Sequence, residues 1–196
     1  QQFVAVGSGG TVLTSANGAD WIDQTATSNT TADLHGVTWS GSVFVAVGVD
    51  ESTLLITSPN GVDWTDRTPT AELTDEGLVQ VAWSGSQFVA VGGAGTVLAS
   101  PNGTVWTPRN SGTTEDLNAA AWSGQQFVAV GEGGAILTSP NGSVWTPRNT
   151  GRTDPLYDIA WSGQQFLAVG ESGVILASPD GITWTPHASG IAESLL

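Results

Sequence analysis

Few residues of this 196-residue chain could carry out catalysis, and their spacing does not bring them together. The chain has no Cys, which excludes disulfides, thiolate nucleophiles and zinc–thiolate sites; it has two His, four Arg, one Tyr and no Lys. Arg67, Arg109 and Arg148 each follow the phrase Trp-Thr-(Pro/Asp) in separate repeated units. Repeat symmetry therefore spaces them apart, and we interpret each as the partner of a nearby acid.

The sequence gives no stronger support for a metal site or for a sugar-cleaving site. The two histidines, His35 and His187, stand near opposite ends of the chain and are interpreted as surface residues. No Asp-x-Asp-x-Asp-Gly calcium loop is present. Glycosidases need two carboxyl groups at a defined separation, and no spacing among the 18 acidic residues indicates such a pair. We predict a non-enzymatic protein with no catalytic residue, metal or cofactor.

The charge balance narrows the choice of partners. Eighteen acidic residues against four arginines give a net charge of −14 and a pI of about 4.1. Such a chain does not neutralise phosphates, which excludes nucleic acid and anionic membrane surfaces as partners. No apolar run approaches the roughly 20 residues of a spanning helix, so we predict no membrane insertion.

The composition also favours a location outside the cell. Lys and Met are absent, and Gly, Ser and Thr are abundant. These features favour a protein that is secreted or held at the cell surface. A start at Gln1 fits a processed mature form, and a domain cut from a longer chain fits equally well.

Internal repetition is the strongest signal in the sequence. Trp-Ser-Gly recurs at spacings of 39 to 44 residues, and Phe-(Val/Leu)-Ala-Val-Gly occurs five times. A second Trp series follows Ser-Pro-Asn-Gly or a close variant of it. We interpret the chain as one domain of five units, which span residues 1–33, 34–77, 78–116, 117–155 and 156–196.

Each unit reads as four short strands. In residues 117–148, segments 117–122, 126–131, 135–139 and 144–148 are separated by Ser-Gly, Glu-Gly-Gly and Pro-Asn-Gly, which form turns. No long stretch keeps the 3.6-residue period of a helix. Four strands in about 40 residues is typical of one blade of a β-propeller. We predict an all-β, five-bladed β-propeller, with the small-residue strand of each unit innermost.

The phrase Ser-Pro-(Asn/Asp)-Gly-x-x-Trp-Thr, after Ala-Val-Gly-x-x-Gly-x-(Ile/Val)-Leu, resembles the Asp-box (BNR-like) repeat. Such repeats occur in sialidases, sortilin-type receptors and photosystem II assembly factor-like propellers. The resemblance covers all five units and implies a propeller in which the box is a structural turn between the third and fourth strands. This chain departs from the usual box, because it is one residue shorter and mostly carries Asn in place of Asp.

One blade lacks an obvious innermost strand. The chain starts directly at the second strand of a unit, while Leu195 falls where Leu117 begins an innermost strand. An open place in a sheet leaves backbone groups unpaired. Three solutions are open: residues 191–196 add a closing strand, residues before Gln1 supply it, or another molecule donates it. The third would make a homo-oligomer, as a ring or filament.

Differences among the copies indicate where a ligand would bind. Most positions are nearly identical, but the entrance of the innermost strand varies. It should flank the mouth of the central channel. We predict a ligand site there, formed by His35, Gln80, Asn118, Tyr157 and Asp158.

Acidic residues concentrate in the loops on the same face of the predicted propeller. This acidic loop face would favour a basic partner. Its predicted members are Asp50, Glu51, Asp75, Glu76, Glu132 and Glu171.

The indole rings of the Trp-Ser-Gly phrases could stack on sugars. They belong to Trp39, Trp83, Trp122 and Trp161. The predicted function is a binding or scaffold module that recognises a protein or glycan through the acidic face. The alternatives are a multivalent lectin and a self-assembling extracellular structural subunit.

Overall fold

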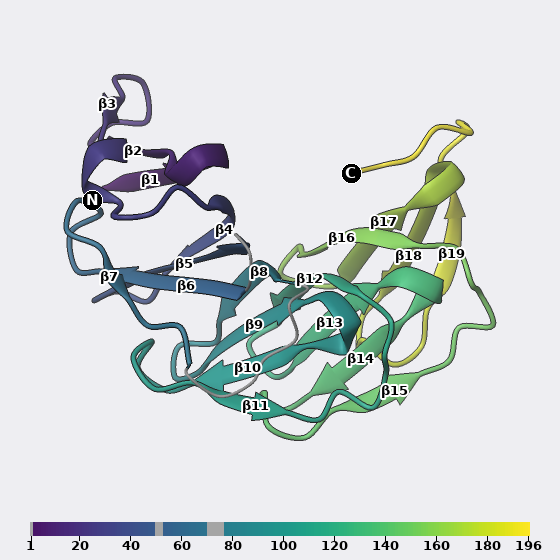
Figure 1. The fold of residues 1–196 in the computed structure, drawn as a ribbon. Coiled ribbons are helices and arrows are strands. Elements are labelled where there is room, and N and C mark those ends of the chain that lie inside the picture. Colours follow the sequence, from purple (N-terminus) through teal and green to yellow (C-terminus); the bar gives the residue numbers. More distant parts are fainter. Residues whose placement is uncertain (1, 50–52, 70–76) are drawn as a thin grey trace.

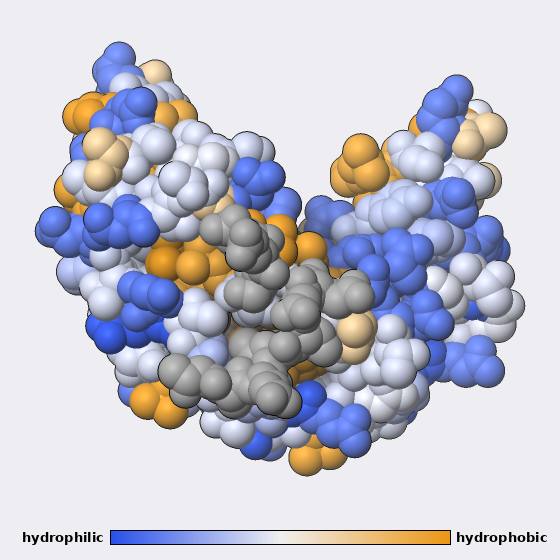
Figure 2. All heavy atoms as spheres, in the orientation of Figure 1, coloured by the Kyte–Doolittle hydropathy of each residue, from blue (hydrophilic) through white to orange (hydrophobic). Residues whose placement is uncertain are grey.

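The chain forms five antiparallel β-sheets that follow one another along an arc (Figure 1). The computed structural model describes residues 2–49, 53–69 and 77–196. The predicted all-β propeller fold is confirmed. The arc is open, because the first and last sheets stand apart and the space-filling view shows a hollow between them (Figure 2).

Four of the five sheets have four strands, and the first has three. The first sheet contains β1 (Phe3–Val6), β2 (Val12–Ser15) and β3 (Ile22–Asp23). The second contains β4 (Asp33–Trp39), β5 (Phe44–Val49), β6 (Thr53–Ser58) and β7 (Thr65–Asp66). The third contains β8 (Leu78–Trp83), β9 (Phe88–Gly92), β10 (Val97–Ser100) and β11 (Thr107–Arg109).

The last two sheets repeat the same plan. The fourth contains β12 (Leu117–Trp122), β13 (Phe127–Gly131), β14 (Ile136–Ser139) and β15 (Thr146–Arg148). The fifth contains β16 (Leu156–Trp161), β17 (Phe166–Gly170), β18 (Val174–Ser178) and β19 (Thr185–Ala188). Short 3-10 turns are η1 (Ser8–Gly10), η2 (Thr25–Thr27), η3 (Gly93–Gly95), η4 (Glu132–Gly134) and η5 (Glu171–Gly173).

The first strands of the complete sheets lie side by side at the centre of the arc. β4 contacts β8, β8 contacts β12, and β12 contacts β16. Space is short there: a Cβ added to Gly36 would lie 3.0 Å from the Cα of Gln80 in the neighbouring strand. This crowding explains why small residues recur in the innermost strands.

Each sheet packs one face on the sheet before it and the other on the sheet after it. Between the fourth and fifth sheets, Val128, Val130 and Ile136 pack against Phe166 and Leu176. The alternation of side chains along a strand creates these two faces, because successive residues point to opposite sides. The Phe-Val-Ala-Val-Gly strands therefore place Phe and Ala on one interface and both Val residues on the other.

The Ser-Pro-Asn-Gly phrase forms a self-contained turn between the third and fourth strands. In the fourth sheet, Ser139 Oγ accepts a hydrogen bond of 2.8 Å from Gly142 N, and Asn141 Oδ1 accepts one of 2.9 Å from Ser143 N. Trp145 Nε1 then donates to Gly142 O at 3.1 Å. Gly142 has a φ of 73°, a conformation that glycine adopts without strain.

Among the described residues, no innermost strand is found in the first sheet, as the repeats predict. Residues 191–196 form no strand, so the first of the three solutions, closure by this segment, is not the one found. Leu195 N instead donates to Gly170 O at 2.9 Å, just as Leu34 N donates to Gly7 O at 3.1 Å. Leu195 therefore takes the place of a residue that begins an innermost strand after the fifth sheet, in agreement with its position in the repeat.

The expected pairing of the three repeated arginines with acids is not found among residues 2–49, 53–69 and 77–196. Arg67 Nε and Arg148 Nε donate to the hydroxyl groups of Thr57 and Thr138, at 3.3 and 2.9 Å. Within the described residues, Arg152 instead forms an ion pair with Asp154, at 2.7 Å. The Thr lies on the neighbouring strand of the same sheet, where its hydroxyl reaches the guanidinium more readily than a loop carboxylate does.

Arg109 is the exception among the three. Its Nε is buried and has no hydrogen-bond partner, because the position of Thr57 and Thr138 is taken by Ala99, which has no hydroxyl. We predict that Ala99→Thr raises the free energy of unfolding by about 1 kcal/mol, the usual net value of such a bond. Urea unfolding measures this change. Ala177→Thr is the matched control, since His187 takes the place of the arginine in the fifth sheet; an equal gain in both variants would contradict the prediction.

Asp180 occupies the turn position where the other units carry Asn. Backbone N–H groups of Thr183 and Ile182 donate to its carboxylate and lower its pKa below the ordinary 3.8. Because the pKa of Asp180 is lower in the folded state than in the unfolded state, its ionised carboxylate stabilises the fold at pH values above the ordinary pKa. This stabilisation is lost as the pH falls through the lowered pKa.

Asp180→Asn keeps the acceptor oxygen and should flatten the acid side of the stability profile. The reciprocal change, Asn141→Asp, should add acid sensitivity for the same reason. Urea midpoints measured from about pH 6 down to about pH 2 test both variants. Profiles that run parallel to that of the unmodified chain would show that this carboxylate does not contribute.

Candidate binding site at the channel mouth

Every complete sheet has a β-bulge at the start of its innermost strand. In the fourth sheet, Leu117 pairs with Gly131 and Ala119 pairs with Val130, so Asn118 is the extra residue. A bulge turns the extra side chain out of the regular alternation and is common beside functional sites. The residues at the four bulges are His35, Val79, Asn118 and Tyr157.

The four bulges meet at one cavity at the centre of the arc. The cavity has a volume of about 430 Å³, and all four bulge residues line it together with Gln80 and Asp158. All five residues predicted for the channel mouth therefore lie together: His35, Gln80, Asn118, Tyr157 and Asp158. Leu196 reaches the same cavity from the C-terminal segment.

Two of these five side chains tie neighbouring innermost strands together. Gln80 Oε1 accepts a hydrogen bond from Ala120 N on the next strand. Asn118 Nδ2 donates to Leu156 O at 2.9 Å and to Glu132 Oε1 at 3.2 Å. These amides hold the wall of the cavity in place, a role that sequence reasoning did not assign to them.

The other three side chains keep polar groups available. No hydrogen bond from the His35 imidazole or the Tyr157 hydroxyl is found within residues 2–49, 53–69 and 77–196. Asp158 Oδ1 accepts from Ile159 N at 2.8 Å, which leaves Oδ2 for another donor. The cavity thus offers an aromatic hydroxyl, a carboxylate oxygen and an imidazole to a ligand.

Two of the six residues predicted for the acidic loop face lie in the described part of the chain. Glu132 and Glu171 begin the η4 and η5 turns, while Asp50, Glu51, Asp75 and Glu76 lie outside the described residues.

Two further acids on that face turn out to be structural. Asp33 Oδ1 accepts from Gly9 N, and Asp116 Oδ1 accepts from Ala94 N, both at 2.8 Å. Each bond joins one sheet to a turn of the sheet before it. The same residue type at the same place in two units was the available signal for this role.

The four Trp-Ser-Gly indoles lie at the other end of the innermost strands and do not line the channel cavity. Each ring packs on the Phe that begins the next strand, at centroid distances of 4.1 to 4.7 Å. Trp83, Trp122 and Trp161 are half-buried, and Trp39 is 43% exposed. Packing therefore uses one face of each ring, and the structure does not bring the four rings together.

Catalytic and metal arrangements are not assembled in the described part of the chain. Arg67 follows β7, while Arg109 and Arg148 end β11 and β15, so the three belong to the outer edges of different sheets. No group of three or more His, Asp or Glu residues that could hold a metal ion is found among the described residues. Likewise, none of the described helices is long and apolar enough to cross a membrane.

Comparison with known proteins supports the fold. No family model matches the chain, and no curated protein matches it. Among solved structures, YCF48 bound to D1 peptide is similar with a TM-score of 0.72 and 16% identity, over 94% of this chain and 62% of that one. YCF48 from Cyanidioschyzon merolae gives 0.69 and 16%, over 96% and 69%.

The likeness extends to another group of propellers. The WD40 β-propeller domain of Doa1 gives a TM-score of 0.68 and 13% identity, over 99% of this chain and 67% of that domain. The chain is thus a β-propeller repeat protein by fold. It spans 62% of the length of the YCF48 chain in the peptide complex.

Some residues of the cavity hydrogen-bond to a neighbouring strand, and others keep their polar groups free. Substitutions in the two groups should therefore differ in their effect on the free energy of unfolding. Gln80→Ala should lower the free energy of unfolding by about 1 to 2 kcal/mol, since it leaves Ala120 N without its partner. Tyr157→Phe removes a hydroxyl that has no hydrogen-bond partner among residues 2–49, 53–69 and 77–196, and it should leave stability unchanged. Chemical unfolding of the two variants tests this; equal losses would contradict the assignment.

Proposed function

We propose that this protein is a non-catalytic binding module that holds a segment of a partner protein at the channel mouth. The observation that carries this proposal is the convergence of four bulges on one cavity of about 430 Å³. The surrounding frame is nearly the same in every unit, whereas the bulge residues differ in size and polarity. Such variety gives a repeated scaffold one site of defined chemistry.

Two further observations support a polypeptide ligand. The free groups of His35, Tyr157 and Asp158 suit the N–H and C=O groups and polar side chains of an extended peptide. A protein of this fold, YCF48, has been solved with a D1 peptide bound, so the architecture can hold a peptide. The net charge of −14 and the Glu132 carboxylate beside the cavity favour a segment that carries Lys or Arg.

A non-catalytic role and a location outside the cell remain part of the proposal. The wide spacing of Arg67, Arg109 and Arg148 supports the former. The absence of Lys and Met supports the latter.

A glycan ligand is a second candidate, with a different site. Trp161, Gln125, Gln126 and Asp180 line a groove of about 360 Å³ between the fourth and fifth sheets. An indole beside amide and carboxylate groups is a combination that suits a sugar ring. The groove lies at the Trp end of the innermost strands, so a change there tests it without disturbing the bulges.

Selection from a phage-displayed library of random peptides, followed by fluorescence anisotropy, tests the peptide site. We expect the selected peptides to carry basic residues and to bind more weakly as salt is added. Tyr157→Ala combined with Asp158→Asn should weaken binding by about tenfold or more, because two central contacts are lost.

Gln125→Ala, in the groove at the opposite end of the strands, is the matched control and should leave peptide binding intact. Peptides that bind the double variant as tightly as the unmodified protein would refute the channel site. A glycan-array signal that disappears in Trp161→Phe would favour the sugar-binding alternative.

A further inference from the structure

In the described part of the chain, no strand covers one edge of the first sheet. β1 pairs with β2 on one side, and within the described residues no strand pairs on the other. In the four complete sheets that side is taken by the innermost strand, which in the fourth sheet pairs Trp122 with Phe127 and Ala121 with Val128. β1 has the same Phe-Val-Ala-Val sequence as the start of β13, so its edge has the same chemistry.

The repeat also shows which backbone groups the empty side presents. Ser123 N donates to Gln126 O across the turn after β12. Because hydrogen-bonded and non-hydrogen-bonded pairs alternate in an antiparallel ladder, Val128 directs its N–H and C=O toward β12. The equivalent residue of β1 is Val4, and Val6 has the same orientation. An unpaired edge of this kind is a template for another strand.

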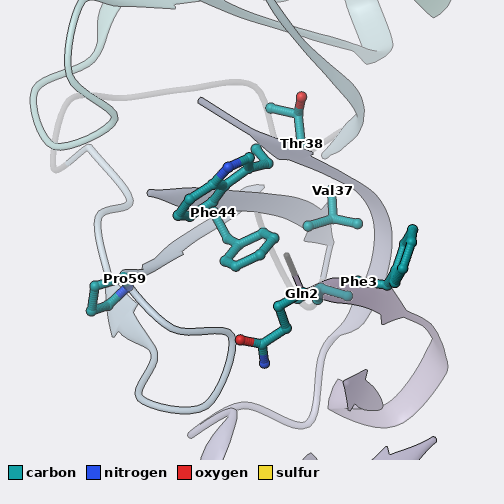
Figure 3. A pocket seen from close by; sticks show the side chains of 8 residues that line it. Gln2, Phe3, Val37, Thr38, Phe44 and Pro59 are labelled. Atoms are coloured by element: carbon teal, nitrogen blue, oxygen red, sulfur yellow. The ribbon is translucent and has the colours of Figure 1, made fainter. Parts of the chain in front are cut away.

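A groove lies directly beside this edge. It has a volume of about 510 Å³ and runs between β1 and β4, with Phe3, Val4, Val37 and Trp39 among its lining residues. Figure 3 shows Phe44 and Gln2 in the middle of the view, with Pro59 on the left and Phe3 on the right.

The equivalent groove between the fourth and fifth sheets is smaller, at about 360 Å³, because Ser123 and Gln125 from the turn after β12 line it. The exposure of Trp39, at 43%, has the same origin: its three counterparts are half-buried beside a complete sheet.

The unpaired side of β1 lies next in the series of innermost strands. β4, β8, β12 and β16 stand side by side, and the empty position next to β4 is the next place in that series. The strands of this layer define what fits. β8, β12 and β16 each begin with Leu and end with Ala-Trp, and Ser-Gly follows. The residue before Trp is small in all three strands and faces the next sheet, as Ala121 faces the core shared with the fifth sheet.

We propose that the β1 edge binds an extended polypeptide of this sequence pattern by strand addition. The added strand runs antiparallel to β1, with its Trp opposite Phe3 and the small residue before it opposite Val4. Its backbone pairs with Val4 and Val6, and its Trp packs on the ring of Phe3, as Trp122 packs on Phe127. The small residue before Trp faces the groove beside Trp39, as Ala121 faces the fifth sheet. This site is separate from the channel mouth and takes a partner of different chemistry, apolar where the channel ligand is polar.

A labelled peptide with the sequence of residues 117–124, Leu-Asn-Ala-Ala-Ala-Trp-Ser-Gly, tests the proposal. We expect saturable binding to the 196-residue chain by fluorescence anisotropy. N-methylation of the Ala before Trp blocks the N–H that faces β1 and should weaken binding by about tenfold or more. N-methylation of the Trp amide, which faces away from β1, is the matched control and should bind like the parent peptide. Changing the peptide's Trp to Ala should weaken binding to a similar extent.

Hydrogen–deuterium exchange then places the bound peptide. Slower exchange of the Val4 and Val6 amides supports strand addition at β1. Equal binding of the two N-methylated peptides, or protection confined to the fifth sheet, would overturn it. Light scattering that shows a dimer or larger assembly, with the β1 amides already protected without peptide, would also overturn it and assign the edge to a second copy of the chain.

Discussion

Burial of each sheet between two neighbours is the constraint on which the rest of the structure depends. A propeller sheet has two apolar faces and cannot cover either one alone. In this chain the two faces differ: one presents Phe, Leu and Trp, and the other presents Val and Ile. The interface between the fourth and fifth sheets joins one face of each kind. The repeats are therefore nearly identical because every internal interface is the same interface.

A frame built from copies cannot distinguish one ligand from another unless something breaks the symmetry. The bulges do this at little cost, because the extra residue leaves the ladder and its side chain packs in neither interface. His35, Asn118 and Tyr157 can then differ freely while Leu117 and its equivalents stay buried. Gln80 and Asn118 go further and bond to the neighbouring strand, so the cavity wall is fixed although its residues are variable.

The sequence predicts the fold well because the same pattern is stated five times. Turn residues, alternation and the two Trp series each point to four-stranded units, and even the absent strand of the first sheet follows from the position of Phe3. The channel residues could be found from their variation among copies. Their bulges could not, since a bulge depends on pairing between strands, and periodicity within one strand does not reveal it.

The arginines show a different limit of sequence reasoning. An acidic chain makes a carboxylate the expected partner of Arg148, yet the nearest acceptor across the strand pair is Thr138. Composition states which partners are abundant, and the register of the sheet decides which one is near. The same register explains why the buried Nε of Arg109 has no hydrogen-bond partner: Ala99 stands where the other two sheets have a Thr.

The outer faces of the first and fifth sheets are of the two different kinds that meet at every internal interface. Leu167 on the fifth sheet is 36% exposed, whereas the equivalent Val128 is fully buried; Trp21 on the first sheet is 43% exposed, and the equivalent Trp64 is 4% exposed. One end therefore presents the Val-type face and the other the Phe- and Trp-type face, the two halves of every internal interface. A strand added to β1 pairs its open edge and lines the groove at Trp39, but it leaves the Trp21 face uncovered. Edge pairing and face burial are thus separate requirements at the first sheet, and only a whole sheet satisfies both.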